Sequence, residues 1–162
     1  MLLSKKHIIA LFLLIGLSGC QTISTSEITA RTQDALNRIE VRDADTRFEQ
    51  IFNRQLLDSL NQGPALRDLV LYTNLSATNS STLAVKGQSS TLSKTQMTLL
   101  YELHDKISKE VITSGKIRVT ATSGTVSSYY GQDKSKQFAA ERLTKQLADK
   151  LVLRLRRFFL DG

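Results

Sequence analysis

Three consecutive segments in which apolar and polar residues alternate occupy the middle of this 162-residue chain. Successive side chains of a β-strand point to opposite faces, so this alternation predicts three strands, each with one apolar and one polar side. The apolar sides are Leu69, Leu71, Thr73, Leu75 and Ala77, then Met97, Leu99, Tyr101 and Leu103, then Ile117, Val119 and Ala121. Turns join the strands, near Lys86–Gly87 after Leu83-Ala84-Val85 and again over His104–Glu110. Consecutive strands joined in this way favour an antiparallel meander with one solvated face.

Two amphipathic helices flank these strands. The first has Asp43 and Asp45 as candidate N-caps, and Thr46 with Glu49 at capping-box spacing, and it ends at Asn61-Gln62-Gly63-Pro64. Its apolar positions are Phe48, Ile51, Phe52, Leu56 and Leu60. The last helix, capped by Asp133 or Ser135, carries an apolar stripe of Phe138, Leu143, Leu147, Leu151, Leu155, Phe158 and Phe159. Its other sides carry Lys136, Arg142, Lys145, Lys150, Arg154 and Arg157.

A short alternating segment, Arg38–Arg42, precedes the first helix and predicts one further strand. The element order is therefore β-α-β-β-β-α over residues 39–162. We predict an α/β (α+β) two-layer sandwich, in which two helices pack on one face of a mixed, mostly antiparallel sheet of about four strands. Two helices cover only one sheet face, so the other face is either solvated or covered by a partner.

The N-terminus has the pattern of an export signal. Lys5 and Lys6 precede an apolar run that is too short to span a bilayer, which needs about 20 apolar residues. The run ends in Leu17-Ser18-Gly19-Cys20, which resembles a bacterial lipobox, where the cysteine becomes the lipidated first residue. The alternatives are an uncleaved anchor or an ordinary secretory signal with a chance cysteine. We expect residues 1–19 to be a lipoprotein signal peptide and residues 20–38, rich in Ser and Thr, to be a lipid-anchored tether. For the end of this tether, from Asp34 to Arg38, both a helix and an irregular segment are compatible with the sequence.

The lipobox implies an anchored envelope protein. Cys20 is the chain's one cysteine, so its use for lipid leaves no thiol for a disulfide. Acyl chains such as palmitate on Cys20 hold a protein stably when two or more are present. Gln21 follows the cysteine, and by analogy with Gram-negative lipoproteins this favours the outer membrane, on its periplasmic side, over retention at the inner membrane.

The inventory of side chains argues against catalysis. His7 belongs to the signal, and His104 is expected to be an exposed residue at a strand end. The sequence contains no Gly-rich phosphate loop, no Cys/His metal spacing and no G-x-S-x-G elbow. We therefore expect neither an enzyme nor a cofactor, metal or nucleic-acid partner. Without Lys5 and Lys6 the mature chain has 20 basic and 15 acidic residues, a net charge of +5 that suits an anionic partner.

The outward side of the predicted sheet is the candidate functional surface. Its residues are Asn74, Ser76, Thr78, Lys94, Gln96, Thr98, Lys116, Arg118, Thr120 and Thr122. This face is either ordinary solvated surface or a surface made to lie against the polar interior of another protein or against phosphorylated sugar. Lys94, Lys116 and Arg118 would then supply charge-assisted hydrogen bonds to phosphate.

The region from about Thr91 to Leu155 resembles the LPS-assembly lipoprotein family LptE, in its alphaproteobacterial branch. The matching features are Gln96–Leu103, a Thr113-Ser114-Gly115 turn, Ser128-Tyr129, Phe138–Arg142, Leu147-Ala148-Asp149 and, earlier, Phe48, Asn53 and Leu56-Leu57. Two features of the family are missing. No Gly-Phe-Arg-Pro-Leu-Tyr type segment follows the cysteine, and Leu92-Ser93 stands where a basic residue often enters the second long strand.

This resemblance implies a two-layer sandwich with a non-enzymatic role. Members of the family lie in the lumen of the outer-membrane barrel LptD, help that barrel to fold and help to deliver lipopolysaccharide (LPS) to the cell surface. The resemblance therefore implies an LptD-like barrel and LPS as partners, with Lys94, Lys116 and Arg118 as candidate contacts. The alternative is a small outer-membrane lipoprotein with a structural or adaptor role in another envelope assembly machine.

Overall fold

The computed structural model describes residues 25–60, 66–82, 92–124 and 128–161. The chain divides between Arg31 and Thr32 into two compact units, and of the first unit the structure describes residues 25–31. The second unit holds the strands and the remaining helices. The signal segment with Cys20, the predicted helix end at Asn61–Pro64 and the predicted turn at Leu83–Gly87 lie outside the described residues.

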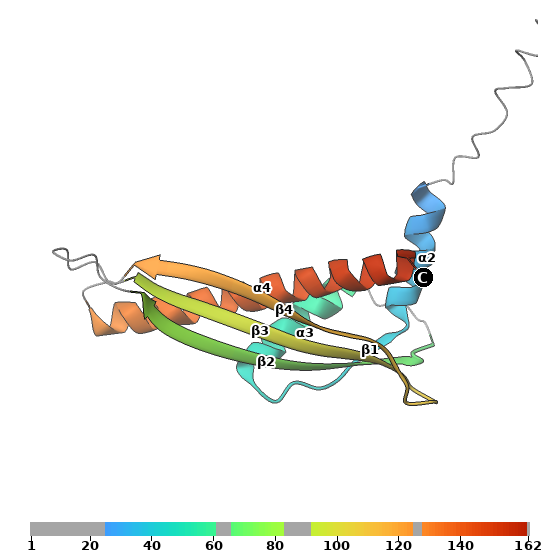
Figure 1. The fold of residues 1–162 in the computed structure, drawn as a ribbon, viewed down its shortest axis with the longest axis horizontal. Helices are drawn as coiled ribbons and strands as arrows, with labels where there is room; N and C mark the ends of the chain where they lie inside the picture. Colours follow the sequence, from blue (N-terminus) through green and yellow to red (C-terminus); the bar gives the residue numbers. More distant parts are fainter. Residues whose placement is uncertain (1–24, 61–65, 83–91, 125–127, 162) are drawn as a thin grey trace, which may run out of the picture. The chain divides into compact units, whose positions relative to one another are not determined.

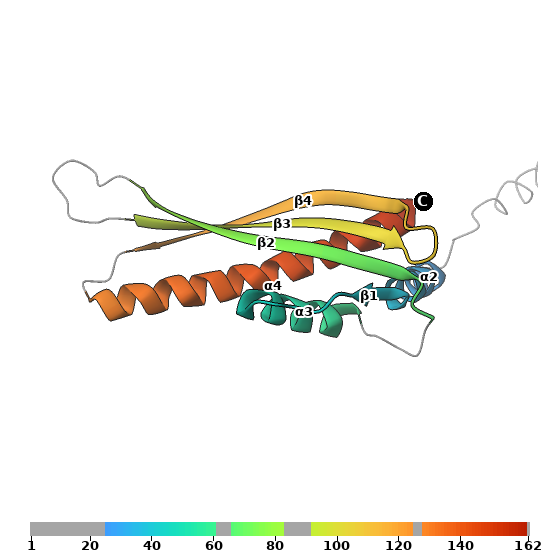
Figure 2. The same cartoon turned by 90° about the horizontal axis from the view of Figure 1, so that it is seen from below.

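The second unit has two layers, a four-stranded sheet and a pair of helices on one of its faces (Figures 1 and 2). The strands are β1 (Ile39–Val41), β2 (Leu69–Thr82), β3 (Leu92–Asp105) and β4 (Val111–Gly124), in the spatial order β1-β2-β3-β4. β1 runs parallel to β2, and the other pairs are antiparallel. The helices of the second layer are α3 (Arg47–Leu60) and α4 (Tyr129–Asp161). The predicted α+β class and element order are confirmed.

The helix α3 begins where the capping-box spacing predicts. The Glu49 backbone N–H donates to Thr46 Oγ1 at 3.3 Å, and the Thr46 N–H donates to Glu49 Oε2 at 2.9 Å. This reciprocal pair satisfies two of the backbone donors that a helix start leaves free. On the inner side of α3, Phe52, Leu56 and Leu60 are fully buried, as the periodicity predicts.

The helix α4 begins four residues before the first cap predicted for it. Ser128 is the N-cap, because its Oγ accepts the Gly131 backbone N–H at 3.0 Å. Leu143, Leu147, Leu151 and Leu155 form the buried stripe, as predicted. Phe138 does not belong to this stripe and is 65% exposed. Ala139 and Ala140, four and three residues before Leu143, face the core instead, since residues at that spacing share one side of a helix.

Three other local predictions need correction. Residues 25–37, expected to be mostly irregular tether, form the helix α2 (Thr25–Asn37), and in the second unit its Leu36 is fully buried in the core. The Gln33 side chain donates to the Leu60 backbone carbonyl at 2.7 Å, which ties this end of α2 to the domain. β2 continues through residues 79–82, beyond the alternation that predicts it, which reaches Ala77, and Thr113–Gly115 lie within β4 instead of forming a turn. The strands β2 and β4 are therefore longer than the hydrophobic alternation alone indicates, because their backbone pairing with β3 continues through polar residues.

Candidate functional site: the open face of the sheet

The sheet face opposite α3 and α4 is uncovered by any other described element, and we call it the open face (Figure 2). The strand register sorts its side chains into rows that cross β2, β3 and β4. We call the end of the sheet where β3 turns into β4 the hairpin end. Counted from that end, the rows are Tyr72–Glu102–Ser114, Asn74–Leu100–Lys116, Ser76–Thr98–Arg118, Thr78–Gln96–Thr120 and Ser80–Lys94–Thr122. Strands of 14 residues make this face about 45 Å long.

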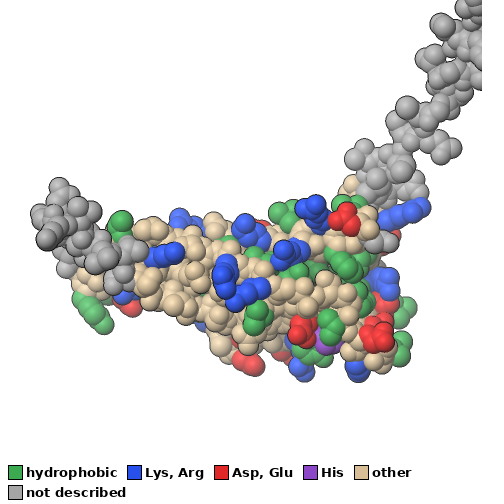
Figure 3. All heavy atoms as spheres, viewed as in Figure 1, with side chains coloured by type: hydrophobic (Ala, Val, Ile, Leu, Met, Phe, Trp, Pro, Cys, Tyr) green, Lys and Arg blue, Asp and Glu red, His purple; other side chains and the backbone are tan. Residues whose placement is uncertain are grey.

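Charge is distributed unevenly along the open face. The four rows from Asn74–Leu100–Lys116 to Ser80–Lys94–Thr122 contain three cations, hydroxyl and amide side chains, one leucine and no carboxylate. Figure 3 shows Lys and Arg side chains along the middle of the molecule, while Asp, Glu and His side chains gather at the end where β3 turns into β4. The four rows therefore form a polar, basic surface on which an anionic group meets no opposing carboxylate.

The three candidate cations are all exposed on this face, but they do not form one cluster. Lys116 and Arg118 are successive outward residues of β4. Lys94 lies on β3 opposite Thr122. Thr122 is four residues beyond Arg118 on β4, which places Lys94 about 13 Å farther along the sheet than Arg118. None of the three forms an ion pair with another described residue. The structure thus brings Lys116 and Arg118 together and leaves Lys94 as a separate positive charge.

The hairpin end of the open face has a different chemistry. His104 Nε2 lies 2.9 Å from Glu102 Oε2, and the His104 ring packs against Tyr72 with a centroid separation of 4.8 Å. The Arg42 guanidinium lies over the Tyr72 ring, 5.1 Å from its centroid. His104 was predicted to be an exposed strand-end residue, but its side chain is only 19% exposed because the strand continues to Asp105 and these neighbours cover the ring. This corner forms a packed polar cluster.

Carboxylates at this end of the sheet are held by positive or N–H partners. The Arg38 side chain donates to Asp68, and this hydrogen bond holds the pKa of the Asp68 carboxyl below its usual range. The Lys106 ammonium donates to Glu40 at 2.6 Å and lowers the pKa of the Glu40 carboxyl in the same way. The backbone N–H groups of Ser108 and Ile107 lower the pKa of Asp105. The first contact joins the residues that precede β1 and β2, the second joins β1 to the β3–β4 hairpin, and the third holds the hairpin turn itself.

A contact that the sequence did not predict lies at the outer edge of the sheet. Arg154 of α4 donates from Nη1 to the backbone carbonyl of Lys116 at 3.2 Å. β4 is the last strand of the sheet in the described residues, so a carbonyl on its outer side has no described strand beside it to pair with. Periodicity places Arg154 on the polar side of its helix, but the identity of its acceptor depends on how α4 lies against β4.

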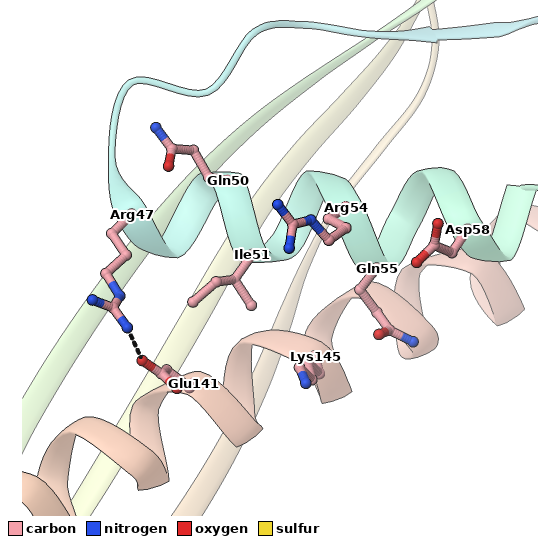
Figure 4. A pocket seen from close by; sticks show the side chains of 8 residues that line it. All are labelled: Arg47, Gln50, Ile51, Arg54, Gln55, Asp58, Glu141 and Lys145. Carbon is pink, nitrogen blue, oxygen red and sulfur yellow. Dashed lines mark hydrogen bonds and ion pairs between the residues drawn. The ribbon is translucent and has the colours of Figure 1, made fainter.

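A groove of about 690 Å³ separates α3 from α4 on the other layer (Figure 4). Arg47 of α3 reaches Glu141 of α4 at 2.8 Å, and Gln55 donates to Asp149 at 3.0 Å. The groove also contains Arg54, Asp58 and Lys145, so its charges are mixed in sign. These contacts join the exposed sides of two packed helices. Because the groove carries both positive and negative side chains, it does not favour an anionic ligand as the open face does.

Other classes of site are not evident in the described part of the chain. No three His, Cys, Asp or Glu side chains within the described ranges come together as a metal site. No described helix combines the length and the apolar character needed to cross a membrane. The predicted lipid-attachment residue, Cys20, lies outside the described residues and stays a prediction.

Comparison with solved structures supports the architecture. A protein from Caulobacter crescentus CB15, provisionally assigned as a lipoprotein, superposes with a TM-score of 0.63 at 20% identity, covering 80% of this chain and 96% of its own. A minor lipoprotein from Acinetobacter baumannii superposes with a TM-score of 0.53 at 15% identity, covering 74% and 90% respectively. Rare lipoprotein B from Shewanella oneidensis also gives 0.53, at 16% identity, covering 72% and 89%.

The likeness is one of fold. Sequence identities of this size do not by themselves carry function from one chain to another. No protein-family model matches the sequence, and no curated protein matches it significantly.

Proposed function

We propose that this chain is an outer-membrane lipoprotein, anchored through Cys20, that assists LPS assembly as the non-catalytic partner of an LptD-like β-barrel. The observation that carries the proposal is the open face, with four successive rows that hold Lys94, Lys116 and Arg118 and no carboxylate. A face of this kind suits two surfaces that meet during LPS export. One is the polar lumen of an outer-membrane barrel, and the other is the phosphorylated part of LPS.

Two further observations support this proposal. The fold is shared with three proteins whose names describe lipoproteins, including one provisional assignment. The sequence resembles the LptE family over most of the mature chain, and the two-layer sandwich that this resemblance implies is the architecture found.

Charge reversal on the open face tests the proposal. The mature chain carrying Lys116→Glu with Arg118→Glu is compared with the wild type for binding of purified LPS and for copurification of a β-barrel from membranes. We expect LPS affinity to fall roughly tenfold or more, because each well-formed charge-assisted hydrogen bond contributes about 1.5–3 kcal/mol. The remaining binding should be less sensitive to salt. Lys145→Glu, an exposed charge reversal on the helix layer, is the matched control.

The outcomes separate the alternatives. Loss of barrel copurification with intact LPS binding identifies the open face as the barrel-docking surface. If the double variant unfolds like the wild type and changes neither measurement, the open face is ordinary solvated surface and the proposal is wrong. Copurification of a different envelope machine in place of a barrel would support the adaptor role instead.

The anchor has its own test. Cys20→Ala should leave the chain as a soluble periplasmic protein or as an uncleaved precursor, because the acceptor for the lipid is gone. Mass spectrometry of the wild-type mature chain should find an acylated Cys20 as the first residue. Any other first residue contradicts the anchoring part of the proposal and leaves the open-face test unaffected.

A further inference from the structure

The outer edge of β4 is a strand edge with no neighbouring strand in the described part of the chain. In an antiparallel strand the N–H and C=O of one residue point to the same side, and this side alternates along the strand. The Lys116 carbonyl points off the edge, since Arg154 binds it there. The register from Leu92↔Gly124 to Leu103↔Thr113 is unbroken, so Arg118, Thr120 and Thr122 also direct their backbone groups off the edge.

A groove of about 590 Å³ lies beside this edge, between the end of β4 and the first turns of α4. Thr122 and Ser123 form one wall, and the other wall includes Phe138, Lys134 and Arg142. Phe138 is 65% exposed, which leaves a large aromatic side chain available for contact. The groove therefore combines strand-pairing groups, an apolar side chain and two cations.

We propose that the β4 edge and this groove bind an extended acidic segment of a partner protein, which adds as a further strand beside Arg118, Thr120 and Thr122. This type of recognition takes its affinity from main-chain hydrogen bonds and its specificity from alternate side chains. Phe138 contacts the apolar side chains of the segment. Arg142 and Lys134 bind its carboxylates, and no residue lining the groove carries a negative charge.

Charge selects an acidic partner over a second copy of this chain. An edge-to-edge dimer through β4 would place two copies of the same surface against each other, each with Arg118 on the strand and Lys134 and Arg142 in the groove, which no carboxylate lines. Like charges in this position oppose pairing, which is a common way in which proteins protect exposed edges. An acidic strand replaces that repulsion with attraction. This surface is distinct from the open face, because it uses the backbone edge of β4 and the start of α4.

Binding of short peptides to the mature chain tests the proposal. The probe is a peptide of alternating Val and Glu, compared with a version in which Lys replaces Glu and a version with a central Pro. We expect the acidic peptide to bind, and the Lys and Pro peptides to bind at least about tenfold more weakly, since they lose the charge attraction and a strand hydrogen bond respectively.

Hydrogen exchange supplies a signature that nonspecific charge attraction does not produce. The acidic peptide should slow exchange at the Arg118, Thr120 and Thr122 amides. The Val119 and Ala121 amides point toward β3 and should already be slow without peptide. Uniform slowing along β4, or no slowing at the three edge amides, overturns the proposal.

Two variants give independent checks. Thr120→Pro removes an N–H that faces away from the sheet, a place where proline is tolerated, and it should abolish peptide binding while thermal unfolding stays close to that of the wild type. Arg142→Glu should weaken binding at least about tenfold, and Lys145→Glu, on the α3 side of the same helix, should not. The proposal is wrong if the acidic peptide fails to bind, if Arg142→Glu binds it normally, or if sedimentation finds the wild type as a dimer. None of these results bears on LPS binding through Lys116 and Arg118.

Discussion

The Tyr101 side chain lies directly across the backbone of Gly115, its partner in the β3–β4 register. A Cβ placed on Gly115 would come within 2.8 Å of Tyr101 Oη and 3.0 Å of its ring. Tyr101 is 4% exposed, so its ring has little room to move away. The missing side chain at Gly115 is therefore what allows a large aromatic residue into the core beside the edge strand.

Gly115→Ala should destabilise the protein by about 1–3 kcal/mol, the usual result of adding a methyl group to a packed site. Chemical denaturation measures the free energy of unfolding. Gly124→Ala is the matched control, because no atom lies within 4 Å of a Cβ built there, and its effect should be within about half a kcal/mol. Equal losses for the two alanines would show that the contact with Tyr101 does not determine the effect.

The α4 stripe predicts a graded series of alanine substitutions. Leu147 and Leu151 are fully buried, so Leu147→Ala or Leu151→Ala should cost about 2–5 kcal/mol. Lys150→Ala and Phe138→Ala, at exposed positions of the same helix, should each cost under about half a kcal/mol in unfolding experiments. A large loss at Phe138 would place that ring in the core and contradict the packing described above.

A buried hydroxyl offers a stabilising substitution. Thr95 is 1% exposed on the inner face of β3, and its Oγ1 has no hydrogen-bond partner among the described residues. A buried polar atom without a partner costs about 1–3 kcal/mol. Thr95→Val keeps the shape and removes the hydroxyl, so the melting temperature should rise. Thr144→Val is the contrast, since Thr144 Oγ1 donates to the Ala140 carbonyl at 2.8 Å and that change should give no such gain.

Acid should loosen the hairpin end of the sheet. The pKa values of Asp68, Glu40 and Asp105 lie below the ordinary values of 3.8 for Asp and 4.5 for Glu. A carboxyl whose pKa is lower in the folded chain stabilises the fold above its ordinary pKa, and this stabilisation is lost as pH falls through the lowered value. Unfolding free energy should therefore decline below about pH 4.5.

Replacing one carboxyl checks this assignment. Asp68→Asn removes the group that pairs with Arg38, so the acid-dependent decline should become shallower. Asp58→Asn, an exposed residue of α3, should leave the slope as it is in the wild type. If Asp68→Asn leaves the slope unchanged, other carboxyls determine the acid response.

Much of the fold could be predicted because its signals are local. Alternation along β3 and β4 identifies Met97, Leu99 and Val119 as core residues, since neighbouring side chains of a strand must face opposite ways. The Thr46–Glu49 capping box fixes the start of α3 for a similar reason: both partners lie within one helical turn. Periodicity also identified the sheet face that carries Lys94, Lys116 and Arg118.

Contacts between distant segments were decided only by the tertiary structure. The pairing of β3 with β4 sets which charges become neighbours, and it separates Lys94 from Lys116 and Arg118. The orientation in which α4 packs against β4 brings Arg154 to the Lys116 carbonyl and leaves the Phe138 side chain exposed to solvent. Register and helix rotation depend on how whole surfaces fit together, and one-dimensional periodicity contains no information about that fit. The sequence by itself therefore determined the layers and their inner faces, while packing decided which residues on the outer surfaces lie close enough to act together.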